Sequence, residues 1–154
     1  MGSDEPPGVF RITKDKVTLR AASRLDDAFA LKVTESCMKK FAEQTWGVWN
    51  GEADFDAASD KIIKFGMNEI GILGVERNSG HWILDKLYIL LAFQNRGIGS
   101  CLIEKLKDDA RGAQVAIRLS VLEVNPAYRF YEKHGFVLTK SIPPRRHMEW
   151  RDSE

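Results

Sequence analysis

Hydrophobic and polar residues alternate in KVTLR, residues 16–20, and this alternation predicts a β-strand. Apolar residues then recur at every fourth position, which predicts a helix over about residues 24–42. The stripe comprises Leu25, Phe29, Val33, Cys37 and Phe41. Ser23 precedes it and Asp26 follows three residues later, a variant of the capping box that starts a helix. A strand followed by an amphipathic helix is therefore expected here.

Three further strands are predicted in the middle of the chain. Residues 43–56, EQTWGVWNGEADFD, are aromatic and acidic with two glycines, and they indicate a loop or short helix. KIIKFG, residues 61–66, is typical of a short strand. EIGILGVER and HWILDKLYILLAF, residues 69–77 and 81–93, indicate two longer strands around the turn NSG.

The remaining pattern alternates helices with strands. After QNRGIGS, residues 94–100, a second long helix is expected to about Arg111, followed by a strand over 115–124. Asn125 is placed to cap a short helix that starts at Pro126 and ends before Gly135. Two final strands are expected at residues 136–141 and 146–150, around a turn at Pro143–Pro144. This order predicts a mixed α/β domain built around one sheet.

Size and charge narrow the functional classes. A chain of 154 residues is expected to form one domain, over residues 13–151, after a flexible acidic and Pro-rich lead over residues 1–12. The net charge of +1 argues against nucleic-acid and membrane-surface binding, which both favour a basic excess. No apolar run approaches the roughly 20 residues of a membrane span, and no secretion signal is evident. A cytoplasmic protein is expected.

Cysteine and histidine residues do not form a recognisable reactive or metal-binding pattern. Cys37 and Cys101 fall on the apolar sides of predicted helices, which favours buried thiols over a disulfide. His81, His134 and His147 have no metal-ligand spacing to one another or to a cysteine. No metal is therefore expected.

The stretch QNRGIGS has two interpretations taken alone. The first N–H groups of a helix lack partners and carry partial positive charge, and glycine lets a phosphate approach such a backbone closely. An ordinary helix-start turn would contain the same glycines. Residues 94–100 match neither the P-loop nor the complete dinucleotide-binding pattern. The stretch NPAYRFYEKHGF, residues 125–136, places Tyr131 on one helical face, where a core tyrosine is the simpler interpretation.

Together, the two stretches resemble the GNAT superfamily of acyl-CoA-dependent N-acyltransferases. Gln94, Gly97 and Gly99 match the family signature Q/R-x-x-G-x-G/A. The second signature, an Asn followed by A-x-x-x-Y-x-x-x-G-F, is matched by Asn125, Ala127, Tyr131, Gly135 and Phe136. The resemblance covers roughly residues 17–150. It implies an α/β fold with a central, mostly antiparallel six- to seven-stranded sheet and about four helices, splayed between the fourth and fifth strands.

The resemblance also implies roles for individual residues. Tyr131 would donate a proton to the departing CoA thiolate, and Asn125 would contact the pantetheine side. The spacing from Asn125 to Tyr131 is six residues instead of the usual seven, so helix capping is an equal alternative for Asn125. The resemblance implies that further residues contact the cofactor, with backbone groups binding the pantetheine arm and the pyrophosphate. These residues are Leu87, Tyr88, Ile89, Gln94, Asn95, Arg96, Gly97, Ile98, Gly99 and Ser100.

The general base and the acceptor pocket are less defined. Some family members carry a Glu that acts as the general base at the position of Ser120. Asp85 is therefore the candidate for the general base here, and a solvent-facing strand residue is the alternative interpretation of Asp85. The acceptor pocket of the family lies between the first helices, where Glu43, Trp46 and Trp49 are candidate substrate contacts. A surface loop anchored by a tryptophan explains the same residues equally well.

The sequence therefore predicts an enzyme that transfers the acetyl group of acetyl-CoA to a primary amine of a small molecule or a peptide N-terminus. The amine would attack directly within a ternary complex of a monomer or homodimer. The partners expected are acetyl-CoA and an amine acceptor, without nucleic acid or membrane. A non-catalytic acyl-CoA-binding or sensing module is the alternative.

Overall fold

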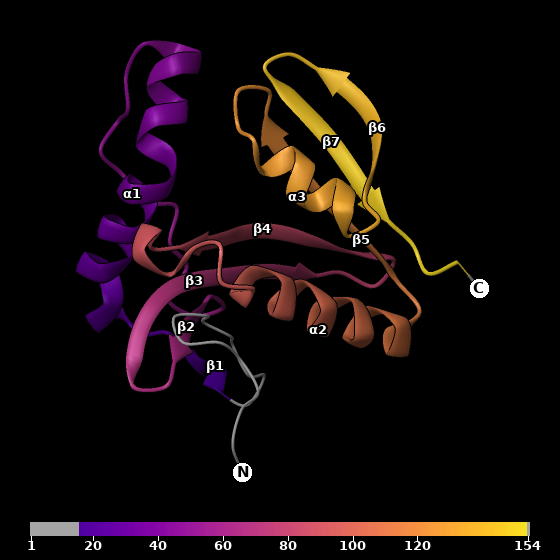
Figure 1. The fold of residues 1–154 in the computed structure, drawn as a ribbon, viewed down its shortest axis with the longest axis horizontal. Helices are drawn as coiled ribbons and strands as arrows, with labels where there is room; N and C mark the ends of the chain where they lie inside the picture. The colour runs from indigo at the N-terminus through magenta and orange to yellow at the C-terminus, as the bar shows by residue number, and fades with distance from the viewer. Residues whose placement is uncertain (1–15, 154) are drawn as a thin grey trace, which may run out of the picture.

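A computed structural model describes residues 16–153, and these residues form a seven-stranded sheet with helices on both faces (Figure 1). The flexible lead expected over residues 1–12 lies outside this range. The sheet order is β1-β2-β3-β4-β5-β7-β6. The strands are β1 (Val17–Ala21), β2 (Lys61–Phe65), β3 (Asn68–Arg77), β4 (His81–Ile89), β5 (Ala116–Leu122), β6 (Val137–Ile142) and β7 (Arg145–Trp150).

Three α-helices and two short 3-10 helices connect these strands within the described residues. They are η2 (Arg24–Asp26), α1 (Asp27–Trp46), η3 (Leu91–Phe93), α2 (Ile98–Ala113) and α3 (Ala127–Lys133). No helix within residues 16–153 is long and apolar enough to cross a membrane. The element order agrees with the mixed α/β prediction.

The sheet divides at the junction of β4 and β5. All other neighbouring strands pair antiparallel, whereas β4 and β5 run parallel. Their ladder contains only three residue pairs and stops at Ile83, so the two strands then diverge. Figure 1 shows β5, β6 and β7 rising at an angle from β4, with α3 beside them. This confirms the predicted splay between the fourth and fifth strands.

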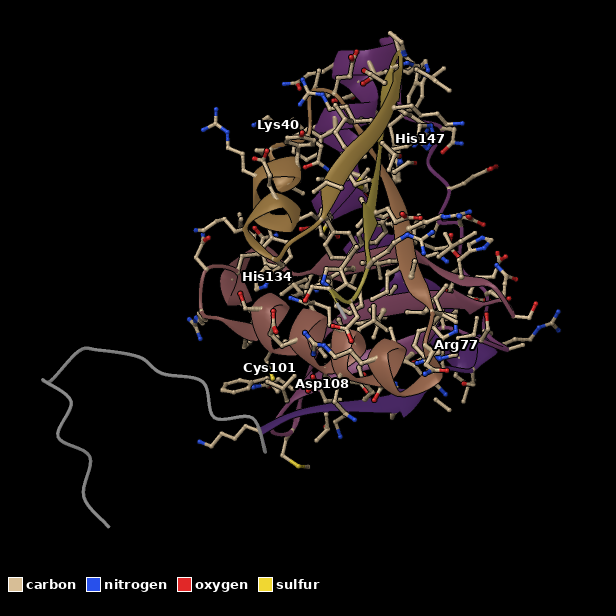
Figure 2. All side chains as sticks on the ribbon, turned by 90° about the vertical axis from the view of Figure 1, so that its right-hand side faces the viewer. Lys40, Arg77, Cys101, Asp108, His134 and His147 are labelled. Atoms are coloured by element: carbon tan, nitrogen blue, oxygen red, sulfur yellow. The ribbon has the colours of Figure 1, made fainter. Side chains whose placement is uncertain are left out.

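Two apolar clusters hold the helices to the two faces of the sheet. On one face, α1 packs Ala30 and Val33 against Ile62 and Ile72. On the other face lies the larger cluster, which includes side chains of α2, α3 and both halves of the sheet. The end of α3, marked by His134 in Figure 2, lies next to α2. The larger cluster therefore continues across the junction of β4 and β5.

The N-terminus of α1 differs from the predicted stripe. Ser23 and Asp26 form the expected capping box, but the capped turn is the 3-10 helix η2. Leu25 lies in that turn and is 96% exposed, because a 3-10 turn advances about 120° per residue and shifts it off the α-helical stripe. Phe29, Val33 and later stripe residues remain on the inner side.

The segment after α1 is a loop, so residues 16–153 contain three α-helices where about four were expected. Gly47 ends α1 in a left-handed conformation with φ +80°, and Gly51 has φ +75°. These conformations interrupt helical hydrogen bonding. Residues 47–60 therefore form a loop, the first of the two alternatives, whereas residues 43–46 of the same predicted segment continue α1.

Strand β4 contains a β-bulge at Asp85. Gly74 of β3 faces Lys86, and Val75 faces Leu84, so Asp85 has no partner on β3. A bulge re-aims side chains locally and is common next to active sites. The sequence pattern gave no sign of this irregularity.

Next to the bulge lies a buried ion pair. Lys86 Nζ lies 3.0 Å from Asp60 Oδ2, and the two side chains are 9% and 3% exposed. Gly74 makes room for the pair, since a Cβ there would lie 2.6 Å from Asp60 Oδ1. Asp60 also accepts from the backbone N–H of Asp56 at 3.0 Å. The pair thus ties the end of the 47–60 loop to the centre of β4.

Replacing Asp60 by alanine is expected to lower the free energy of unfolding by about 3–5 kcal/mol, because it leaves a buried lysine cation without a partner. The control is Asp109→Ala, which removes the exposed helical pair with Lys105 and is expected to cost less than about 0.5 kcal/mol. Urea denaturation of both variants measures the difference. Equal small losses would show that water compensates the Lys86 cation.

Candidate active site

A cleft of about 1090 Å³ opens where β4 and β5 diverge. Its walls come from the C-terminal half of α1, the 47–60 loop, β4, the turn before α2, β5 and α3. Most of the residues singled out in the sequence line this one cleft: Asp85, Leu87, Tyr88, Ile89, Gln94, Asn95, Gly97, Gly99, Ser100, Asn125, Tyr131, Trp46 and Trp49. Segments more than eighty residues apart in the chain therefore meet at a single site.

The edge of β4 that faces β5 has no partner strand after Ile83. From Leu84 to Ile89 the strand pairs only with β3, through residues such as Leu87 with Leu73 and Tyr88 with Ile72. Alternate backbone groups of a strand point to each edge, so the unpaired N–H and C=O groups face the cleft. An extended, amide-containing ligand can add to this edge as an extra strand does.

The turn before α2 presents unsatisfied N–H groups to the cleft. Asn95 has φ 61° and Gly97 has φ 85°, so two residues of the turn are left-handed. Asparagine is one of the few residues besides glycine that tolerates this conformation. The first N–H groups of α2, from Ile98 to Ser100, have no carbonyl one turn back to bond. Such a turn favours an anion.

Gln94 braces the end of β4. Its Nε2 donates to the carbonyl oxygen of Ile89 at 2.8 Å. The Cys37 thiol of α1 contacts the same oxygen at 3.3 Å, and burial raises the pKa of this thiol to about 11. Both cysteines are free and half-buried. The Gln94 side chain therefore connects the turn before α2 to the unpaired edge of β4.

Gly99 allows α3 to approach α2 closely. A Cβ at Gly99 would lie 3.3 Å from the Phe130 ring, which is closer than most real Cβ contacts. At Gly97 a Cβ would meet nothing within 4 Å, and the positive φ is the constraint there. The two glycines of the G-x-G pattern thus have different physical roles, helix packing and turn conformation.

Tyr131 lies on the cleft wall formed by α3. The side chain is 8% exposed, and its ring packs edge-to-face on Phe130 and Phe136. Burial raises the pKa of the Tyr131 phenol well above its ordinary value, so the hydroxyl stays protonated. Within residues 16–153, no group forms a hydrogen bond with this hydroxyl. Every fully enclosed polar side-chain atom in the same residues has a partner, so the Tyr131 hydroxyl is not fully enclosed. The hydroxyl therefore reaches the cleft space.

Asn125 caps the start of α3 and also lines the cleft. Its Oδ1 accepts from the N–H of Ala127 at 2.9 Å. The capping alternative considered for Asn125 is thus present in the structure, in a residue that also lines the cleft.

Carboxylates line the part of the cleft nearest the β4 bulge. Asp85 is exposed there together with Glu52 and Asp54. Partial desolvation against the cleft wall raises the pKa of Asp85; the Lys86 charge opposes this, and the charges of Glu76 and Asp54 add to it. Burial also raises the pKa of Tyr88 to about 12. This end of the cleft favours a cation.

Trp46 and Trp49 line the mouth of the cleft, whereas three other predicted residues lie outside it. Arg145 of β7 sits 5.9 Å from the Trp46 ring and also lines the cleft, so it bridges the two walls. From the sequence alone, Arg145 is predicted to lie in a solvated turn, with contact to the CoA 3′-phosphate as the less favoured alternative. Three predicted site residues do not line the cleft. Glu43 is exposed on α1, and Ile98 is buried in the core. The Arg96 guanidinium lies 5.3 Å from the Phe93 ring.

Comparison with solved structures identifies the fold. PaiA N-acetyltransferase from Thermoplasma acidophilum, in complex with coenzyme A, is similar with 16% identity and a TM-score of 0.73, over 88% of this chain and 99% of that one. Arabidopsis thaliana Naa50, in complex with the bisubstrate analogue CoA-Ac-MVNAL, is similar with 18% identity and a TM-score of 0.65, over 89% and 99%.

A third similar structure is N-acetylglutamate synthase from Neisseria gonorrhoeae with coenzyme A and L-arginine, at 13% identity and a TM-score of 0.64, over 90% of this chain and 34% of that one. The TM-scores show a common fold. No curated protein sequence matches the chain with comparable significance. The model of the acetyltransferase (GNAT) domain family matches residues 48–138, which include both signatures. Since this match covers more than half of the chain, the protein belongs to the GNAT acetyltransferase family.

Proposed function

We propose that the protein transfers the acetyl group of acetyl-CoA to a primary amine of a small molecule or a peptide N-terminus. Direct attack by the amine, with both substrates bound, needs a donor site, an acceptor site and a proton donor in one space. The observation that carries the proposal is that one cleft contains an open strand edge, an anion-binding turn and the Tyr131 hydroxyl. This convergence favours catalysis over a binding-only module.

The donor side of the cleft fits the chemistry of acetyl-CoA. The β4 edge from Leu87 to Ile89 offers backbone groups to the amides of the pantetheine arm. The N–H groups at the start of α2 offer donors to the pyrophosphate. Bound acetyl-CoA supplies a thioester carbon open to attack by an amine. A backbone N–H on the β4 edge stabilises the negative charge that develops on the thioester oxygen.

Tyr131 serves as the proton donor to the thiolate that leaves. Its raised pKa keeps the phenol protonated at every physiological pH. A thiol has a reference pKa of about 8.5, so complete transfer from a phenol is uphill in water. Tyr131 therefore stabilises the departing sulfur through a hydrogen bond first and transfers its proton late.

The acceptor side fits an amine that is cationic in solution. Glu52, Asp54 and Asp85 attract an ammonium group into the cleft by charge. The ammonium has to lose a proton before it attacks, and the raised pKa of Asp85 makes this carboxylate the better base. Asp85 lies at the bulge, where the strand aims it differently from its neighbours.

Replacing Tyr131 by phenylalanine is expected to lower turnover about 100-fold and to leave the affinity for acetyl-CoA within about threefold, since only the proton donor is lost. Tyr128→Phe is the matched control, because Tyr128 lies on the same helix, packs under Arg146 and does not line the cleft. Thiol release and calorimetry measure the two quantities. Unchanged turnover in Tyr131→Phe would assign Tyr131 to packing, and absence of acetyl-CoA binding at millimolar concentration would contradict the proposed function.

Replacing Asp85 by asparagine is expected to lower turnover of a cationic amine by about 10- to 100-fold, with acetyl-CoA affinity unchanged, because the proton acceptor is lost. Glu76→Gln removes a neighbouring negative charge outside the cleft and is expected to change turnover less than about threefold. Full activity of Asp85→Asn over a panel of amines would exclude Asp85 as the base.

A further inference from the structure

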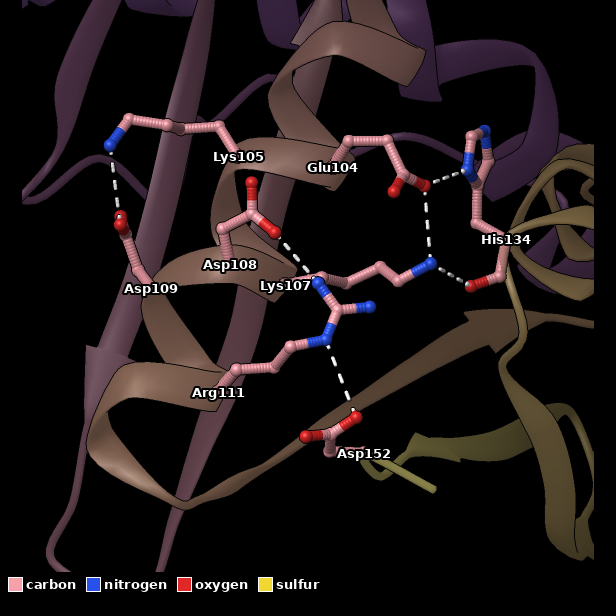
Figure 3. Close-up of polar contacts among 8 residues, drawn as sticks. All are labelled: Glu104, Lys105, Lys107, Asp108, Asp109, Arg111, His134 and Asp152. Carbon is pink, nitrogen blue, oxygen red and sulfur yellow. Dashed lines mark hydrogen bonds and ion pairs between the residues drawn. The ribbon is translucent and has the colours of Figure 1, made fainter. Parts of the chain in front are cut away.

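Three side chains form a hydrogen-bonded chain below the turn that precedes α2. Ser100 Oγ lies 3.0 Å from His134 Nε2, and His134 Nδ1 lies 2.8 Å from Glu104 Oε2. Figure 3 shows the Glu104 end of this chain, with Lys107 bonded to the same carboxylate oxygen. Ser100 also lines the cleft, at the third residue of α2. The chain therefore runs from helix α3 to the anion-binding turn.

Glu104 determines which histidine nitrogen carries the proton. The hydrogen bond from His134 lowers the pKa of Glu104 the most, so this side chain is a carboxylate that only accepts hydrogen bonds. His134 Nδ1 must then be the donor in their contact. In the neutral imidazole the other nitrogen, Nε2, has no proton and accepts. The Ser100 hydroxyl consequently donates its hydrogen to His134.

In that state the Ser100 hydroxyl turns its lone pairs toward the cleft. A phosphate oxygen is also an acceptor, so it gains no hydrogen bond from Ser100 and meets a partial negative charge. When the imidazole is protonated, Nε2–H donates to Ser100 Oγ instead. The Ser100 O–H is then released and can donate to an anion beside the free N–H groups of α2.

We propose that His134 is a positioning residue that couples binding of the CoA diphosphate to uptake of a proton. The inference rests on the proposed function, because it assumes that the turn before α2 holds the diphosphate. Protonated His134 orients Ser100 as a donor, and neutral His134 orients it as an acceptor. Affinity for the diphosphate therefore rises as the pH falls and the imidazole takes up a proton.

The charged groups around His134 come from both helices. Glu104 of α2 accepts from His134 Nδ1 at 2.8 Å. Lys107 Nζ lies 3.1 Å from the same carboxylate oxygen and also donates to the His134 carbonyl at 3.0 Å. Lys133 precedes it on α3 and lines the cleft. The Phe130 ring, 4.8 Å from the imidazole centre, covers another side. The arrangement leaves the Ser100 hydroxyl as the imidazole's link to the cleft.

Dephospho-CoA is the suitable probe, because it retains the diphosphate but lacks the 3′-phosphate, whose own ionisation near pH 6 would confuse the measurement. Calorimetry with the full chain between pH 5.5 and 8, in buffers of different ionisation enthalpy, gives affinity and proton uptake together. The wild type is expected to bind about five- to tenfold more tightly at the acidic end, the effect of about one hydrogen bond. Binding near neutral pH is expected to take up a fraction of a proton.

His134→Gln keeps a donor near the Nε2 position but cannot change charge, so its affinity is expected to be independent of pH. Ser100→Ala, a mild change in the first turn of a helix, is expected to lose the gain at acidic pH and serves if the first variant folds poorly. His147→Gln, far from His134 on β7 in Figure 2, is the control and should keep the wild-type profile.

Two results would overturn the inference and leave the proposed function intact. One is wild-type binding with the same affinity at all pH values, and the other is a pH profile retained by His134→Gln or Ser100→Ala. Failure of the wild type to bind either dephospho-CoA or CoA at any pH would instead remove the donor site, and with it both proposals.

Discussion

The rest of the structure depends on the end of one hydrogen-bond ladder. The parallel pairing of β4 with β5 stops at Ile83, and beyond it the backbone of β4 faces open space. Unpaired strand edges are normally covered or charged in proteins, because they attract other strands. Here the edge instead lines a cleft of about 1090 Å³. The fold thus exposes main-chain hydrogen-bonding groups at the surface where we propose that acetyl-CoA binds.

Packing keeps the divergence open. The larger apolar cluster continues from α2 into α3 and both halves of the sheet, so the two halves stay joined by a common core although a cleft opens between β4 and β5. Close contact of α3 with Gly99 sets the distance of Tyr131 from the turn before α2. The bond from Gln94 to Ile89 fixes the same turn to the end of β4. The proposed donor site is therefore built from elements that restrain one another.

Local sequence pattern was sufficient for the order of strands and helices, because the apolar period of each segment reports which side faces the core. It also located the cap at Ser23 and the turn before α2. Features that depend on pairing between distant segments were missed. The bulge at Asp85 arises from the pairing register of β4 with β3. Asn95 adopts its left-handed conformation within a turn that is bonded to the end of β4 through Gln94. Periodicity alone did not exclude Glu43 from the acceptor site, because an exposed position on a helix gives no sign of whether it faces the cleft or solvent.

The buried contact of Lys86 and Asp60 beside Gly74 has an evolutionary consequence. Any larger residue at position 74 meets the Asp60 carboxylate, while loss of either charged residue leaves the other buried alone. Single substitutions at the three positions are therefore each unfavourable, although a jointly apolar set could pack well. Such positions change together in a lineage or not at all. Homologous sequences should accordingly show either all three residues or a concerted replacement, with few intermediates between them.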